Sequence, residues 1–158
     1  PAEFSVGDFW NTTHFRLGYR RLRRRMLRVR MLELYGPRCP FTGDLHPSLD
    51  GHRFEIQLGH VYPLALDGPD TLLNTLLMSG LANWAWDEGL ISLTTAGRVL
   101  VAEGASADTA ARIPANRQIE FPKDPRYWPR AEFLERHRDL VFGRGMRAAL
   151  ALMNNTPA

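Results

Sequence analysis

The stretch 54–102 constrains the fold most, because short extended segments and one short helix follow one another there, separated by turns. Phe54–Leu64 begins with alternating apolar and polar residues, which is typical of a strand. Thr71–Met78 is apolar and is either a second short strand or a buried connection. Gly80–Glu88 has the pattern of a short helix that follows a serine N-cap, and Leu90–Ala102 has the pattern of a hairpin. This order of elements predicts an α+β fold.

Helices are predicted on both sides of this stretch. Over 14–35 apolar residues recur at three- and four-residue steps, and Gly36 and Pro37 end the helix. Its apolar stripe consists of Phe15, Tyr19, Leu22, Met26 and Val29, widened by Leu27, Met31 and Leu34. A small helix is predicted over Ser106–Arg112 and a longer C-terminal one at about 130–142. We expect a single domain over 1–158 with its core at about 37–102, flanked by the helices at 14–35 and 130–142.

The first of these helices carries a cluster of arginines. No acidic residue lies between Asp8 and Glu33, although the formal net charge of the chain is only +3. The arginines in this interval are Arg16, Arg20, Arg21, Arg23, Arg24, Arg25, Arg28 and Arg30. Clustered arginine is typical of phosphate binding, and the alternatives are a solvated face or an acidic protein partner. The residues that we expect to contact nucleic acid are Arg16, Arg20, Arg21, Arg23, Arg24 and Arg28.

Cysteine content and hydropathy exclude several classes of protein. Cys39 is the only cysteine, so the chain has no internal disulfide and no zinc knuckle built from several cysteines. We expect it to be a small buried residue in a turn. No apolar run approaches the roughly 18 residues that a membrane span needs. The N-terminus lacks the order of a signal peptide, so we expect a cytoplasmic protein with no membrane contact.

Short motifs follow one another in a specific order along 39–93. Cys39-Pro40-Phe41-Thr42-Gly43 comes first, followed by Leu58-Gly59-His60-Val61-Tyr62-Pro63-Leu64, by Gly68-Pro69-Asp70 with Asn74, and by Ser79-Gly80-Leu81-Ala82-Asn83-Trp84-Ala85-Trp86-Asp87 with Gly89-Leu90-Ile91-Ser92-Leu93. This series resembles the HNH endonuclease family of ββα-metal nucleases, in particular the branch with a Cys-x-x-Thr-Gly lead. The resemblance is close over 39–93 and looser over the flanking helices. It implies a ββα-metal core in which a histidine on a strand faces a cation ligand on the helix.

The resemblance implies two roles outside the helix of this motif. His60 is then the general base that takes a proton from the attacking water, because histidine ordinarily titrates near neutral pH. Without the surrounding motif, His60 would be interpreted as a histidine with no chemical role. Asn74 organises the loop between the strands by side-chain hydrogen bonds and does not touch the substrate. As an ordinary turn residue, Asn74 would have a similar structural role.

The predicted metal site departs from the family pattern at two positions. Asn83 stands where the family usually has histidine, and its amide oxygen favours Mg²⁺, with Mn²⁺ as the alternative. Gly59 stands where many members have an aspartate ligand. Asp87 lies one helical turn after Asn83, where it either binds the ion or braces the end of the helix.

The two tryptophans of the same helix have two interpretations. Trp84 and Trp86 either stack on unpaired bases or pack the helix against the sheet, and packing is the prediction. His137 in the C-terminal helix is expected to pack or to hydrogen-bond within its helix. Glu55 and Gln57 flank the active strand, and we assign neither a catalytic role.

These features together predict a metal-dependent endonuclease that hydrolyses DNA phosphodiester bonds, by family analogy in restriction or defence. The alternatives are a catalytically degenerate HNH-fold module that binds DNA and a domain that binds an acidic protein. Cutting both strands with one active site per chain favours a homodimer. The chain begins at a proline, which allows for a larger protein whose further domain selects the target.

Overall fold

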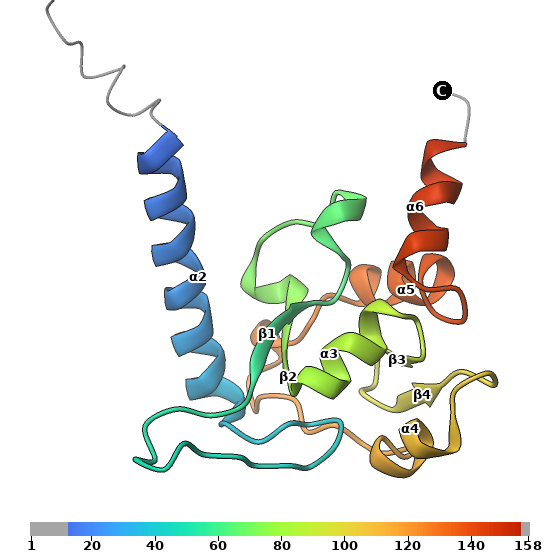
Figure 1. Cartoon of the computed structure of the whole chain (residues 1–158), viewed down its shortest axis with the longest axis horizontal. Helices are drawn as coiled ribbons and strands as arrows, with labels where there is room; N and C mark the ends of the chain where they lie inside the picture. The colour runs from blue at the N-terminus through green and yellow to red at the C-terminus, as the bar shows by residue number, and fades with distance from the viewer. Residues whose placement is uncertain (1–12, 156–158) are drawn as a thin grey trace, which may run out of the picture.

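A computed structural model describes the backbone of residues 13–155 and the side chains of residues 20–155. Its helices are α2 (Thr13–Tyr35), α3 (Gly80–Asp87), α4 (Ala107–Arg112), α5 (Ala131–Leu140) and α6 (Met146–Asn154), and its strands are β1 (Gln57–His60), β2 (Thr75–Met78), β3 (Ile91–Leu93) and β4 (Val99–Val101) (Figure 1). Short 3₁₀ helices η1 (Leu64–Leu66), η2 (Leu72–Asn74) and η3 (Pro125–Tyr127) lie between them. The α+β class that the sequence predicts is confirmed.

The centre of the fold is a ββα unit. β1 and β2 pair antiparallel, so that His60 lies opposite Thr75 and Gln57 lies opposite Met78. α3 follows β2 directly and packs against both strands and against β3. β3 and β4 form a separate antiparallel hairpin on the far side of α3 (Figure 1). The predicted extended segment 54–64 is therefore a strand only at 57–60, because the chain turns at Val61 and Tyr62.

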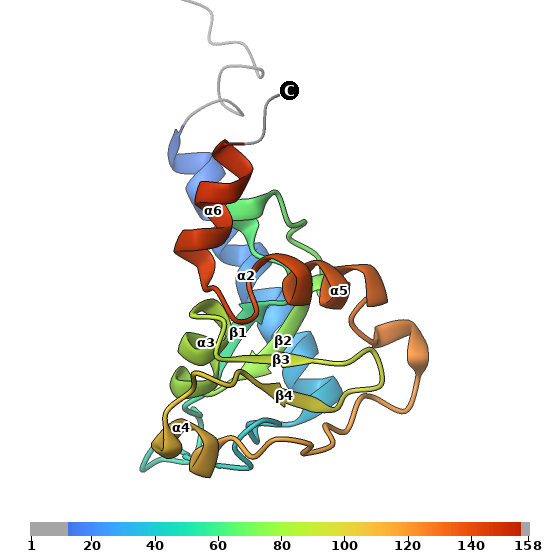
Figure 2. The ribbon, with the colours of Figure 1, turned by 90° about the vertical axis from the view of Figure 1, so that its right-hand side faces the viewer.

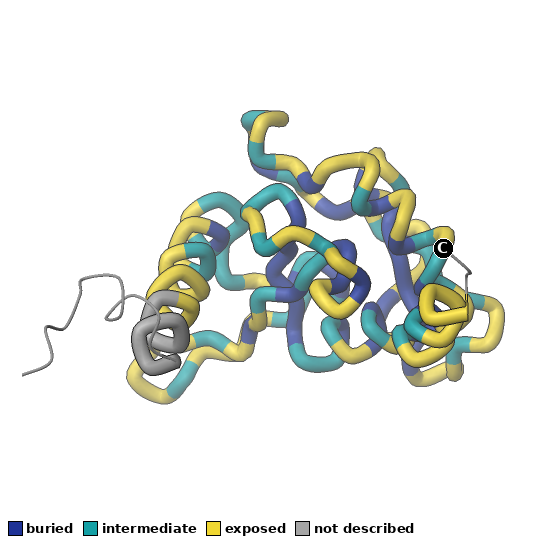
Figure 3. The backbone as a smooth tube through the Cα atoms, turned by 90° about the horizontal axis from the view of Figure 1, so that it is seen from above, coloured by how far each residue is buried: buried dark blue, intermediate teal, exposed yellow. Residues whose placement is uncertain are grey.

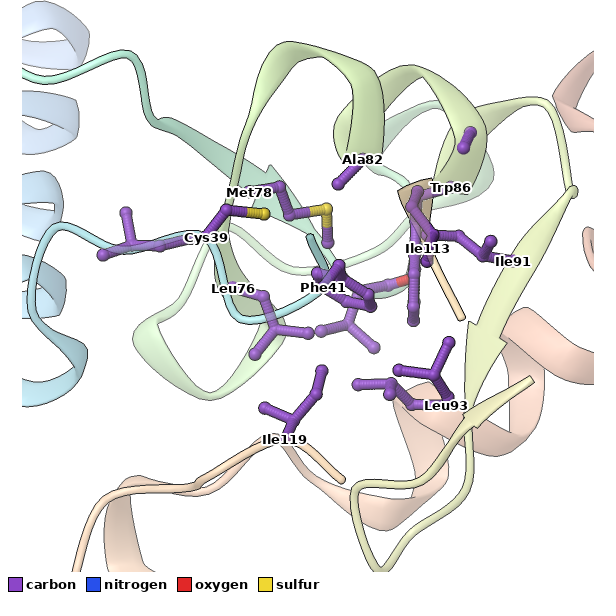
Figure 4. Close-up of a cluster of buried hydrophobic side chains, with 14 of the residues drawn as sticks. Cys39, Phe41, Leu76, Met78, Ala82, Trp86, Ile91, Leu93, Ile113 and Ile119 are labelled. Carbon is purple, nitrogen blue, oxygen red and sulfur yellow. The ribbon is translucent and has the colours of Figure 1, made fainter. Parts of the chain in front are cut away.

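The core of this unit gathers around the Trp86 side chain of α3, which is fully buried. The Phe41 ring meets Trp86 edge-on, with ring centroids 5.8 Å apart, and Figure 4 shows both beneath α3 among aliphatic side chains. The indole Nε1 of Trp86 donates a hydrogen bond of 3.0 Å to the carbonyl oxygen of Val61. Fully burying one large aromatic side chain contributes about 3 kcal/mol. This indole also fixes α3 to the residue that follows β1.

His137 of α5 is fully buried against the same indole. The imidazole and Trp86 rings stack with centroids 3.9 Å apart. The His137 Nδ1 lies 2.8 Å from the Ser92 hydroxyl, and its Nε2 lies 3.1 Å from the carbonyl oxygen of Trp86. The Nε2–H therefore donates to the carbonyl, and Nδ1 accepts from the hydroxyl. Burial lowers the pKa of His137 from 6.5 to about 3, so the imidazole is neutral in the folded protein.

The N-terminal helix α2 does not bury its apolar stripe. Leu22, Met26 and Val29 are 57%, 64% and 51% exposed, whereas Met31 near the end of the helix is fully buried. Figure 3 shows exposed backbone segments along much of this helix. The physical reason is that α2 contacts β2 of the ββα unit only through its C-terminal part, while its N-terminal part extends past the core (Figure 1). The described part of the stripe is therefore largely a surface feature, and the side chains of Phe15 and Tyr19 lie outside the described residues.

The helix α6 is not among the elements that the sequence predicts. It begins after Gly143 and Gly145, both of which adopt positive φ, and it buries Ala149 against a small cluster with Leu66. α2 and α6 extend to the same side of the ββα unit (Figures 1 and 2). The predicted C-terminal helix at 130–142 is α5, two residues shorter at its end. None of the described helices is long and apolar enough to cross a bilayer.

The buried neutral His137 predicts that acid destabilises the fold. Because its folded pKa lies below the unfolded value of 6.5, the unfolded chain binds the proton first as pH falls. The stability from this group is present above pH 6.5 and is lost progressively between pH 6.5 and 3. We expect the free energy of unfolding to fall by about 2 kcal/mol between pH 7 and pH 5 through His137 alone.

Urea unfolding at both pH values, for wild type and His137→Gln, measures this effect. The glutamine variant is less stable at pH 7 but loses less stability on going to pH 5, because glutamine at position 137 does not titrate. An equal loss in both proteins would contradict the assignment.

Candidate active site

A hollow of about 220 Å³ lies beside the ββα unit. Its lining comes from α2, β1, the loop around η1, α3 and the start of α6, and consists of Arg24, Leu58, Gly59, His60, Pro63, Leu64, Ala65, Asn83, Asp87 and Met146. Three residues singled out as base or metal ligands, His60, Asn83 and Asp87, therefore meet at one hollow, together with a predicted DNA-contacting arginine. The fourth, Asn74, does not line it.

His60 ends β1, where the register with β2 fixes its backbone. Its side chain is only 10% exposed. The imidazole Nε2 lies 3.0 Å from Oδ1 of Asp70, which belongs to the loop between the two strands. Asp70 was not among the predicted site residues, although it belongs to the Gly68-Pro69-Asp70 motif.

Asn74 is fully buried and holds the ends of this loop together. Its Oδ1 accepts a hydrogen bond of 2.8 Å from the backbone N–H of Tyr62, and its Nδ2 donates to the carbonyl oxygens of Tyr62 and Pro69, both at 2.8 Å. These three bonds satisfy most of the hydrogen-bonding capacity of the amide. Asn74 therefore acts on the site through the loop that follows His60.

The start of α3 is capped by three side chains from different segments. The Ser79 hydroxyl accepts from the backbone N–H of Ala82 at 3.3 Å, and the Glu55 carboxylate accepts from that of Gly80 at 2.8 Å. Cys39 Sγ accepts from the backbone N–H of Ser79 at 3.3 Å. A carboxylate at a helix N-terminus is favoured by the helix dipole. These caps fix the start of the helix that carries Asn83 and Asp87, and they give Glu55 a structural role that sequence reasoning did not find.

Gly59 and Asn83 face each other across the hollow. A Cβ atom at position 59 would lie 2.5 Å from Asn83 Oδ1 and 3.1 Å from Met78 Sδ. The Asn83 amide thus occupies space that a side chain at position 59 would need. The two departures from the family pattern are therefore spatially linked.

Asp87 is a half-buried carboxylate one turn after Asn83. Burial raises the pKa of Asp87 above its ordinary value, the Glu88 carboxylate raises it further, and His60 opposes both effects. Among the described residues, none forms a hydrogen bond or an ion pair with this carboxylate, so no such contact supports the bracing role. A carboxylate that is costly to bury without a partner gains from a bound cation.

The donor atoms of Asn83 and Asp87 fit a hard divalent cation. An amide oxygen and a carboxylate oxygen are ligands that Mg²⁺ accepts, with substrate phosphate and water as its other ligands. Among the side chains of residues 20–155 there is no group of three or more His, Cys, Asp or Glu that is arranged to hold a metal. The residues present fit a Mg²⁺ ion that shares its coordination with substrate better than a tightly held zinc ion.

The predicted DNA-contacting arginines of α2 fall into two groups. Arg20, Arg21 and Arg24 are exposed, and Arg24 lines both the hollow and a neighbouring groove of about 400 Å³. Arg28 instead donates to the carbonyl oxygens of Phe54 and Ile56, and Arg23 donates to the carbonyl oxygen of Asp70. The second group attaches α2 to the ββα unit. The side chain of Arg16 lies outside the described residues.

The two tryptophans of α3 differ in burial. Trp86 packs in the core, as predicted, but Trp84 is 53% exposed, so the packing prediction was wrong for Trp84. The reason is geometric: two residues along a helix correspond to a rotation of about 200°, which turns one ring toward the core and the other toward solvent.

Comparison with known proteins supports the fold. No family model matches the chain, and no curated protein matches it in sequence. One of the solved structures that match is that of a modification-dependent TagI restriction endonuclease, with a TM-score of 0.57 and 19% identity over 71% of this chain. The matched region spans only 36% of that endonuclease. At this identity, the similarity establishes a shared fold.

The contact between Gly59 and Asn83 predicts the effect of a single methyl group. Gly59→Ala places a Cβ against Asn83 Oδ1, and overpacking of this kind costs about 1–3 kcal/mol unless the amide moves away. We expect a lower melting temperature, or weaker metal binding if the amide is displaced. Gly104→Ala is the matched control, since its Cβ would meet nothing within 4 Å. Thermal melts and Mn²⁺ titrations of both variants check this, and a silent Gly59→Ala would refute the tight contact.

Proposed function

We propose that this protein is a metal-dependent endonuclease that hydrolyses DNA phosphodiester bonds. The observation that carries the proposal is that His60, Asn83 and Asp87 line one hollow beside Arg24. Hydrolysis of a phosphodiester needs a base for water, stabilisation of the charge on phosphate, and an oriented substrate. The hollow brings together a residue for each of these requirements.

In the proposed mechanism, His60 accepts a proton from the water that attacks phosphorus. Arg24 binds a non-bridging phosphate oxygen and orients the backbone for attack. Asn83 and Asp87 would hold a Mg²⁺ ion, which when bound would supply charge stabilisation to the phosphate and to the departing 3′ oxygen. The resemblance to HNH nucleases implies products with 5′-phosphate and 3′-hydroxyl ends.

The surface next to the hollow supports DNA as the substrate. Arg24 links the hollow to the groove lined by Arg24, Arg25, Arg28, Gln57 and Leu58. Positive side chains along one path from the hollow suit a phosphate backbone. The name of the TagI endonuclease, a modification-dependent restriction enzyme, supports restriction or defence as the setting, with the chain acting as the cutting unit of a larger protein or of a homodimer.

A catalytically degenerate DNA-binding module remains the second candidate, and one observation favours it. Because Asn83 Oδ1 lies over Gly59, the hollow offers only two side-chain ligands from α3. Such a site binds a cation weakly until phosphate arrives.

A cleavage assay separates the two candidates. Supercoiled plasmid incubated with Mg²⁺ or Mn²⁺ is expected to be nicked by wild type, and His60→Ala is expected to lower the rate by about 10²–10⁴, because general-base catalysis contributes that much. Asn83→Ala and EDTA are expected to abolish metal-dependent cleavage. His52→Ala is the control, since that histidine is exposed on a loop. If wild type and His60→Ala are equally inactive with every metal while both retard DNA, the degenerate module is correct.

Binding has its own test at Arg24. Arg24→Gln is expected to weaken binding of a short duplex without sequence preference and to reduce the slope of log K against log salt by about 1, as expected for one lost phosphate contact. Arg98→Gln on the β3–β4 hairpin, an exposed arginine that lines neither the hollow nor the neighbouring groove, is the control and should match wild type. Fluorescence anisotropy between 50 and 200 mM salt, the range in which phosphate contacts are resolved, measures both. An unchanged slope in Arg24→Gln would remove Arg24 from the proposed phosphate path.

A further inference from the structure

The loop between β1 and β2 presents a carboxylate to the proposed base. Asp70 Oδ1 lies 3.0 Å from His60 Nε2, and the two side chains are 32% and 10% exposed. No other hydrogen bond to the imidazole occurs among the described residues. Arg24 and Asp87 share the hollow with His60, but neither is hydrogen-bonded to it.

This contact determines which ring nitrogen is free. An ionised carboxylate only accepts hydrogen bonds, so the nitrogen that faces it must carry the proton. With Nε2 protonated, Nδ1 of neutral His60 keeps its lone pair and is the nitrogen that can take a proton from water. In the serine-protease triad a carboxylate fixes the histidine tautomer in this way, and its replacement by an amide costs on the order of 10⁴ in rate.

Asp70 is itself held from two sides. Arg23 of α2 donates to its backbone carbonyl, and the Arg23 Nε lies 3.9 Å from Asp70 Oδ2. Asn74 Nδ2 donates to the carbonyl oxygen of the preceding Pro69 at 2.8 Å. Gly68 permits the tight turn, because a Cβ there would lie 2.1 Å from the carbonyl oxygen of Tyr62. The carboxylate is therefore placed by the fold and is not a loosely held surface group.

The geometry points to Asp70 as a positioning residue that holds His60 in the Nε2-protonated tautomer with Nδ1 directed to the attacking water. Arg23 ties this loop to α2, so the helix proposed to bind phosphate also supports the base. The inference rests on the proposed function for its catalytic meaning, whereas the tautomer is a property of the protein itself.

Two variants of similar size isolate the hydrogen bond. Asp70→Asn keeps the shape of the side chain but replaces the carboxylate by an amide, whose NH2 can donate to an unprotonated Nε2, and Asp70→Leu keeps the approximate volume but makes no hydrogen bond. Asp139→Ala, an exposed aspartate on α5, controls for loss of one negative charge. Long-range ¹H–¹⁵N spectra of the full chain at pH 8, with His60 assigned through His60→Gln, distinguish a protonated from an unprotonated ring nitrogen.

Wild type and Asp139→Ala are expected to show protonated Nε2 and unprotonated Nδ1. Asp70→Asn and Asp70→Leu are both expected to lose this preference, because neither presents an ionised carboxylate to Nε2. If wild type carries its proton on Nδ1, or if Asp70→Leu leaves the spectrum unchanged, the inference is overturned. The tautomer measurement does not depend on cleavage. A protein that fails to cut DNA would therefore overturn the proposed function but not the tautomer assignment.

Kinetics then test the catalytic meaning. In an active protein, Asp70→Leu is expected to lower kcat about 10²-fold while the Kd for DNA changes less than about twofold, and the isosteric Asp70→Asn is expected to lower kcat at least as much. A merely structural role would change binding and melting temperature together with the rate, and the asparagine variant, which keeps the shape of the side chain, would keep most of kcat. Equal kcat in wild type and Asp70→Leu would refute the positioning role.

Discussion

The Trp86 indole fixes the position of α3 relative to β1. The candidate site depends on this position, because its proposed base lies on β1 and its proposed cation ligands lie on α3. Its Nε1–H bonds to the carbonyl oxygen of Val61, the residue after His60, so the helix with the proposed cation ligands is tied to the strand with the proposed base. The His137 imidazole stacks on the indole, and its Nε2–H donates a hydrogen bond to the backbone carbonyl oxygen of Trp86. A buried N–H that lost its acceptor would cost about 1–3 kcal/mol, so sliding of α3 along β1 is strongly opposed.

The loop between the strands solves a second problem, which is how to hold a polar side chain at the edge of the core. Asn74 satisfies the backbone groups of Tyr62 and Pro69 with its own amide, and buried polar groups are stable only when satisfied in this way. Closing the loop also brings Asp70 to His60. Asn74 thus acts on the site indirectly, by positioning the loop that carries the Asp70 carboxylate. The sequence motif alone does not identify this carboxylate as part of the site.

The sequence predicted the elements whose signals are local. The serine cap of α3, the alternation at β1 and the helical periodicity of α2 are each written in a few neighbouring residues. It did not predict which of two tryptophans is buried, because that depends on His137, which lies 51 residues from Trp86. Nor did it predict α6, although Met146, Ala149 and Leu150 have the spacing of a buried helical face.

The apolar stripe of α2 shows that helical periodicity predicts a helix but does not predict whether its apolar face is buried. Leu22, Met26 and Val29 carry an amphipathic pattern, but whether such a face is buried depends on what lies opposite, and the apolar core of the ββα unit meets only the last turns of the helix. Asp70 escaped prediction for a related reason, since its contact with His60 is made by the folded loop and by Arg23 of α2.

The opposite charges of Asp87 and Arg24 around the hollow favour binding of a cation and a phosphate together. Asp87 is a half-buried carboxylate without an ion pair among the described residues, and burial raises its pKa, whereas Arg24 contributes a positive charge to the same lining. A cation that binds alone is attracted by Asp87 and repelled by Arg24. A phosphate that binds alone is attracted by Arg24 and repelled by Asp87. When the cation and the phosphate are both bound, their mutual attraction offsets these two repulsions. This attraction is stronger in a hollow that is partly shielded from water. On the proposed function, this coupling lets a site with only two side-chain ligands hold its ion when DNA is present, and it makes the pairing of Gly59 with Asn83 compatible with catalysis.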